Sequence, residues 1–141
     1  MIACRRMSAA ERLDVFALLS PVRTDQVALG SALTLIVERE DYGFVWVAFD
    51  ENERTVGCAV LSYAISTEAG GLVACLDDVV VERGARGAGV GTAMLDALAD
   101  RLRALAIVRV RTNVSRALHL TPFFTACGFV HRDDEGFSRA I

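Results

Sequence analysis

The segment at residues 86–92 reads RGAGVGT and combines an arginine with three glycines directly before a helical apolar pattern. A helix N-terminus attracts anions through its unpaired backbone N–H groups and the positive end of its dipole. Glycines let that backbone approach a ligand without side-chain collision, and the planar guanidinium of Arg86 suits phosphate oxygens. The segment therefore predicts a site for a phosphate-bearing ligand.

Two common phosphate-binding motifs do not fit this spacing. A Walker loop needs Lys followed by Ser or Thr after its last glycine, but Val90 follows Gly89 and the chain has no lysine. A dinucleotide fingerprint that starts at Gly87 and Gly89 needs a further glycine at position 92, where Thr92 stands. Neither interpretation is retained.

The pattern that does fit is Arg-x-x-Gly-x-Gly, met as Arg86, Gly89 and Gly91 and followed by an apolar helix. Together with the acidic pair and valine triplet at residues 77–81, and with Asn113 and the FF and GF pairs at residues 123–124 and 128–129, it resembles the GNAT superfamily of N-acetyltransferases, in the form of single-domain bacterial members. The resemblance covers nearly the whole chain in element order. It is sharpest over residues 76–129.

The resemblance implies that acetyl-CoA is the acyl donor. The pantetheine amides would pair with the central strand by strand addition, the glycine turn would bind the pyrophosphate, and Asn113 would lie near the pantetheine arm. The cofactor-binding residues implied in this way are Val79, Val80, Val81, Arg86, Gly87, Ala88, Gly89, Val90, Gly91, Thr92, Asn113 and Phe124.

The implied chemistry is attack of a neutral primary amine on the thioester, which requires a group to take the amine's proton. Asp77 is the candidate general base, through water, while Asp78 is expected to point to the opposite strand face. Phe124 stands where many relatives carry a tyrosine that protonates the leaving thiolate. His119, Ser115, Thr121 and bulk water are the remaining proton sources, and the sequence leaves this choice open.

The elements that position these residues follow from hydrophobic periodicity. A capping box at residues 8–11 starts a helix that runs to about residue 19, and Thr24 is expected to cap a second helix that ends near residue 38. Strands are predicted at residues 44–49, 56–65 and 72–81, after a short edge strand at the start of the chain.

After the glycine turn, a helix is predicted to about residue 105, followed by a strand at residues 107–112. In that strand valines alternate with Arg109 and Arg111, so one face is apolar and the other can meet solvent or anions. A helix over residues 116–127 ends at Gly128, and strands at 129–131 and 137–141 are expected to close the sheet.

The predicted fold is a mixed α/β (α+β) domain with a central sheet of about six to seven strands flanked by about four helices. The resemblance implies splayed central strands that hold the acyl-CoA. At 141 residues, the chain is expected to form one N-acetyltransferase domain over residues 1–141.

The composition of the chain limits the classes of molecule that it is expected to bind. The net charge of −3 argues against nucleic acid and suits an amine acceptor that is itself cationic. No membrane segment or secretory signal is predicted, so a cytoplasmic location is expected. The four cysteines lack the close pairing of zinc sites, so no metal is predicted and Cys127 is interpreted as a core thiol. Relatives often dimerise, which leaves a homodimer open.

Two other interpretations stay open beside the enzyme. Phe124 and the uncertain base also fit a weakly active or inactive module that binds and senses acyl-CoA. A toxin that acetylates aminoacyl-tRNA would share the glycine motif, but the acidic net charge disfavours it.

Overall fold

The computed structural model describes residues 1–141 and contains one five-stranded sheet in the order β1-β2-β3-β4-β5. The strands are β1 (Ala3–Arg6), β2 (Gly43–Phe49), β3 (Thr55–Ser66), β4 (Gly71–Val81) and β5 (Arg109–Thr112). Pairing is antiparallel from β1 to β4 and parallel between β4 and β5. The predicted mixed α/β class with splayed central strands is confirmed, with fewer strands than expected.

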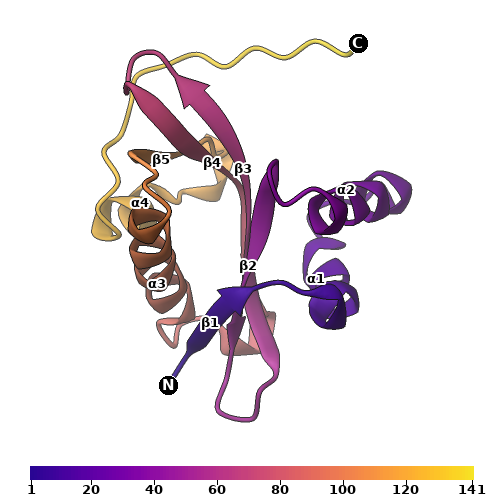
Figure 1. The fold of residues 1–141 in the computed structure, drawn as a ribbon. Helices are drawn as coiled ribbons and strands as arrows, with labels where there is room; N and C mark the ends of the chain where they lie inside the picture. Colours follow the sequence, from indigo (N-terminus) through magenta and orange to yellow (C-terminus); the bar gives the residue numbers. More distant parts are fainter.

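Four α-helices flank this sheet: α1 (Arg12–Leu19), α2 (Gln26–Glu38), α3 (Val90–Ala104) and α4 (Thr121–Ala126). The α1 and α2 pair covers one face, while α3 and α4 cover the other (Figure 1). Short 3₁₀ turns at Ala9–Glu11, Arg83–Ala85 and Arg116–Leu118 lead into α1, the glycine turn and α4. None of the helices is both long and apolar enough to cross a membrane.

The sheet divides the core in two because successive strand residues point to opposite faces. On the α3 side the core consists of Phe44, Trp46, Ala48, Val56, Ala59, Leu61, Ala74, Leu76, Val90, Met94, Leu95, Leu98, Leu102 and Phe124. On the α1 and α2 side it consists of Met7, Val15, Leu19, Leu29, Leu33, Val45, Val47, Phe49 and Cys58. Strand β2 is buried along its whole length.

The helix starts follow local side-chain chemistry. The predicted capping box is present, with Ser8 and Glu11 satisfying each other's backbone groups ahead of α1. The cap of α2 is one residue later than expected, because the Asp25 carboxylate, and not Thr24, accepts a hydrogen bond from the N–H of Ala28 at 3.0 Å. Both helices are thereby fixed at their N-terminal ends.

The predicted helix over residues 116–127 is split. His119 adopts a left-handed conformation with φ of 50°, and α4 begins only at Thr121. Pro122 explains the break, since proline lacks an N–H and fits the first turn of a helix but not its interior. Gly128, with φ of 87°, ends α4 as expected.

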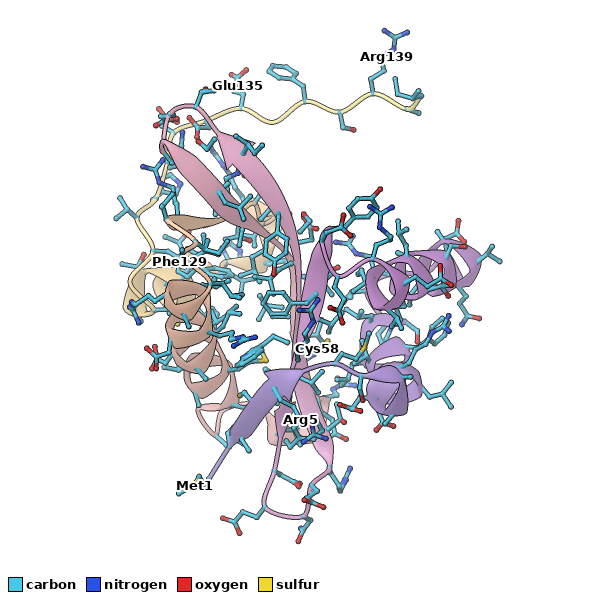
Figure 2. All side chains as sticks on the ribbon, in the orientation of Figure 1. Met1, Arg5, Cys58, Phe129, Glu135 and Arg139 are labelled. Carbon is cyan, nitrogen blue, oxygen red and sulfur yellow. The ribbon has the colours of Figure 1, made fainter.

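The two predicted strands at residues 129–131 and 137–141 are absent, which reduces the sheet from six or seven strands to five. Val130 and Phe137 are exposed, and the segment leaves the body of the protein with Glu135 and Arg139 projecting outward (Figure 2). Charged residues dominate positions 132–135, and Arg132 pairs with Asp134 at 2.6 Å. Without a continuous apolar face, this segment has little to gain from packing on the sheet.

Candidate acyl-donor and acceptor sites

The glycine turn leads from β4 into α3 and leaves backbone donors exposed. Gly87 and Gly89 have φ of 79° and 80°, in the left-handed region where side chains are strained. Gly89 is the N-cap of α3 and supplies no side-chain cap, and the helical hydrogen bonds begin with the N–H of Ala93 donating to its carbonyl at 3.0 Å. The N–H groups ahead of Ala93 are thus available to an anion.

Two further contacts shape this turn. The Nε of Arg86 donates to the carbonyl of Val81 at 3.1 Å, which ties the turn to the end of β4 while the exposed guanidinium stays beside the glycines. A Cβ on Gly91 would lie 3.2 Å from ring carbons of Phe123, so glycine there allows α3 to approach α4 closely. The turn therefore has the geometry of a phosphate cradle, with one positive charge at its edge.

The strands β4 and β5 separate beside this turn. They pair only where Val73–Leu76 of β4 lies beside Arg109–Thr112 of β5, and β4 then continues to Val81 without a partner on that edge. At the branch point the Thr112 hydroxyl donates to the Leu76 carbonyl at 2.8 Å. Val79 and Val81 thus lie on a strand edge without a partner strand, which a ligand carrying amide groups can extend. The Val81 carbonyl on this edge already accepts from Arg86, so the Val79 backbone and the Val81 N–H are the groups left for a ligand.

A β-bulge interrupts β4 at the acidic pair. Val60 of β3 pairs with Asp78 and Leu61 pairs with Leu76, so Asp77 is the extra residue. Leu76 and Val79 both pack in the core on the α3 side, which leaves the two aspartates on the other face. The expectation that Asp78 points away from Asp77 is therefore wrong, because the bulge breaks the alternation on which it relied.

The two carboxylates have different partners. Asp78 forms an ion pair with Arg23, from the segment between α1 and α2, at 2.5 Å, and its side chain is only 15% exposed. Asp77 keeps contact with solvent and accepts a long hydrogen bond of 3.5 Å from the Ser62 hydroxyl. Partial burial and the nearby charge of Asp78 raise the pKa of Asp77. Asp77 is thus the carboxylate suited to accept a proton.

Asp77 lies in a polar cleft of about 330 Å³. The cleft opens on the face of β4 and β5 that lies opposite α3, and its lining consists of Arg23, Cys75, Leu76, Asp77, Arg111, Thr112 and Asn113. A second cleft of about 450 Å³ is mainly apolar and runs from the same Arg23–Asp78 pair along α1 and α2. The ion pair thus stands between a polar cleft and an apolar one.

The other predicted site residues lie in two places. Asn113 follows β5 and lines the polar cleft beside Asp77. Phe124 is only 7% exposed and packs edge-to-face against Phe123 and Phe129, with ring centroids 5.1 and 5.2 Å away. Burial raises the pKa of the Cys127 thiol, so this residue is held in the unreactive thiol form.

Arg23, Ser62 and Thr112 are functional candidates that the sequence did not single out. Arg23 lies between two helices and Ser62 within an apolar strand, and their meeting with the acidic pair depends on tertiary structure. Arg111 had a signal, since its alternation with valines already indicated a face that can meet anions. The contacts of Arg23 and Ser62 join residues far apart in the chain, so no residue spacing in a single sequence predicts them.

Comparisons with known proteins agree with this geometry. The GNAT acetyltransferase domain family matches residues 41–131. An acetyltransferase from Trypanosoma brucei is 23% identical with a TM-score of 0.77, over 99% of this chain and 100% of its own. For glucosamine-6-phosphate N-acetyltransferase from Arabidopsis thaliana the identity is 15% and the TM-score is 0.77, over 99% and 98% of the two chains.

A third solved structure, an aminoglycoside N-acetyltransferase in complex with CoA, is 16% identical with a TM-score of 0.82, over 99% of this chain and 95% of its own. At these identities the structures establish the fold. No curated protein sequence gives a significant match.

Proposed function

Because the chain belongs to the GNAT acetyltransferase family, we propose that it transfers an acetyl group from acetyl-CoA to a primary amine by direct attack in a ternary complex. The observation that carries the proposal is the arrangement along β4. This strand has a bulged aspartate facing a polar cleft, then a free edge, and then a glycine turn at a helix N-terminus. A donor and an acceptor can meet at the bulge.

The donor side of the proposal uses the free edge and the turn. The pyrophosphate would be held by the backbone donors of residues 86–92 and by the Arg86 guanidinium. The pantetheine amides would pair with β4 at Val79 and Val81, with Val80 between them and Asn113 beside the arm. Phe124 would pack in the core behind the pantetheine site. The aminoglycoside N-acetyltransferase of the same fold was solved with CoA, which supports this donor.

The acceptor side uses the polar cleft. Acetyl-CoA supplies a thioester carbonyl as the electrophile. Asp77 would accept a proton from the ammonium group through water and leave a neutral amine to attack, and the raised pKa of Asp77 improves its match to this task. A backbone N–H on the free edge of β4, such as that of Val79, would stabilise the developing oxyanion. Water would protonate the leaving thiolate, since Phe124 has no proton to give.

A second candidate function is an acyl-CoA-binding module without significant turnover. Phe124 favours it, because the aromatic residue expected to act as the acid has no hydroxyl and is buried between two other rings. This module would use the same turn and strand edge for binding. The two candidates differ only in the chemical step.

The test is release of CoA thiol from acetyl-CoA over a panel of primary amines. We expect release with at least one amine, and a loss of about 10²-fold or more in Asp77→Ala, within the range for general base catalysis. Asp100→Ala is the control, because Asp100 is an exposed acid on α3 that pairs with Arg103. Thermal stabilisation by acetyl-CoA without release from any amine would favour the binding module. Equal release by the wild type and Asp77→Ala would refute the base assignment.

A further inference from the structure

Arg111 is a charged side chain in the polar cleft without an acidic partner. It lies opposite Cys75 in the pairing of β5 with β4, and its Nε donates to the Cys75 sulfur at 3.3 Å. No carboxylate forms an ion pair with it, and the remaining guanidinium donors are free for a ligand. A thiol is a weak acceptor, so this contact orients the guanidinium without neutralising it.

The neighbouring arginines each have a carboxylate partner within the protein, although the partner of Arg109 also contacts Arg132. Arg23 pairs with Asp78 at 2.5 Å, and Arg109, two residues before Arg111 on the same strand face, pairs with Glu68 at 3.7 Å. The cleft is left with one carboxylate, Asp77, and one guanidinium, Arg111. This is the complement of a zwitterion, because an ammonium group suits the first charge and an anion suits the second.

We propose that the acceptor is a small amine that also carries a carboxylate or a phosphate, with its anion bound by Arg111 and its amine at Asp77. This inference rests on the proposed function and names its substrate class. Asp77 lies two residues along β4 from the partner of Arg111, so their Cα atoms are separated by roughly 8 Å, from two strand rises and one strand spacing. That spacing and the 330 Å³ cleft suit a short molecule.

The competing role for Arg111 is that of a solvated charge on β5, which is an edge strand. Charged side chains on such strands oppose edge-to-edge association. In that role Arg111 would not influence which amine is acetylated. The orientation by Cys75 and the position beside Asp77 favour the binding role, and acceptor selectivity separates the two.

The experiment compares matched acceptors that differ only in the anion. The pairs are β-alanine with β-alaninamide, and 2-aminoethyl phosphate with ethanolamine, at saturating acetyl-CoA. We expect kcat/KM for the anionic member of at least one pair to be about 10 to 100 times higher, the range for a hydrogen bond to a charged group. The pair that shows the preference distinguishes a carboxylate from a phosphate.

The variants assign this preference to the side chain. Arg111→Gln is expected to abolish it by raising KM for the anionic acceptor, with kcat and KM for acetyl-CoA unchanged. Arg111→Lys should retain part of it, because a lysine keeps the charge but not the planar fork. Arg109→Gln, on the same strand face, should keep the full preference. A preference for the neutral members, or an anion preference that survives in Arg111→Gln, would overturn the inference while leaving acetyl transfer intact.

If none of these amines is acetylated, the proposed catalysis with these acceptors is refuted. A binding measurement then decides whether Arg111 forms an anion site. Calorimetric titration of β-alanine and of 2-aminoethyl phosphate, in the presence of CoA, then measures the cleft directly. Binding to the wild type that is lost in Arg111→Gln supports the anion site. Absence of binding to the wild type, or equal binding to both proteins, overturns it.

Discussion

Substitution of Gly89 by alanine tests the cradle by its backbone alone. Gly89 has φ of 80°, and a Cβ there would meet no protein atom within 4 Å. The substitution therefore creates no clash and acts only through the strain of a left-handed alanine, about 1–2 kcal/mol. For a chain of this length, 1 kcal/mol corresponds to roughly 3–4 °C in Tm. The unliganded variant is expected to melt about 3–8 °C below the wild type.

The same substitution should weaken the response to acetyl-CoA, because the strained residue caps the helix whose N–H groups are proposed to hold the pyrophosphate. At a concentration of 100 times Kd, a ligand that binds only the folded state stabilises by about 2.7 kcal/mol, or roughly 8–11 °C in Tm. A tenfold loss of affinity reduces this to about 1.4 kcal/mol at the same concentration, or roughly 4–6 °C. The ligand-induced shift should thus be about halved.

The assay is thermal unfolding with and without acetyl-CoA, with Gly84→Ala as the control. Gly84 lies in the adjacent 3₁₀ turn, lacks a positive φ, and has no atom within 4 Å of an added Cβ. The control should melt at or slightly above the wild type, because alanine restricts the unfolded chain, and it should keep the full shift with acetyl-CoA. A Gly89→Ala protein that keeps the full shift with acetyl-CoA would show that the pyrophosphate binds elsewhere. An unliganded Tm equal to that of the wild type would refute the strain argument.

Three further predictions concern Asp77 and Phe124. Wild-type kcat/KM should rise with pH through the raised pKa of Asp77, and Asp77→Asn should lose this limb. Because the folded pKa lies above the unfolded one, ionised Asp77 destabilises the fold at neutral pH and this destabilisation disappears as pH falls through both values. Asp77→Asn should therefore unfold at a slightly higher temperature than the wild type at pH 7, and a lower Tm would contradict the sign. Phe124→Tyr is expected to leave turnover with acetyl-CoA unchanged or raise it, and a large loss would show that packing against Phe123 and Phe129 dominates.

The glycine turn was predictable from the sequence because its determinants are local. The left-handed positions at Gly87 and Gly89 and the apolar stripe of α3 lie within a few residues of one another. The helices α1 and α2 were predictable for the same reason, although the cap moved from Thr24 to Asp25. Where one segment determines its own conformation, residue type and spacing were enough.

The missing strands show the opposite case. A strand is stabilised by its partner, and residues 129–131 and 137–141 carry aromatic and β-branched residues of the types enriched in strands. Whether such a segment pairs depends on the apolar area that it buries against the sheet, and Val130 and Phe137 bury very little. Propensity alone therefore overestimated the number of strands.

The bulge at Asp77 was hidden in the sequence for a different reason. An unbroken strand with the same residues would place Asp77 and Asp78 on opposite faces. The extra residue places both on one face, where two adjacent carboxylates repel each other and one needs a counter-ion. Arg23 forms its ion pair with Asp78, while partial burial and the charge of Asp78 together raise the pKa of Asp77. The register shift therefore distinguishes the ion-paired Asp78 from Asp77, the proposed proton acceptor, which residue identity alone could not do.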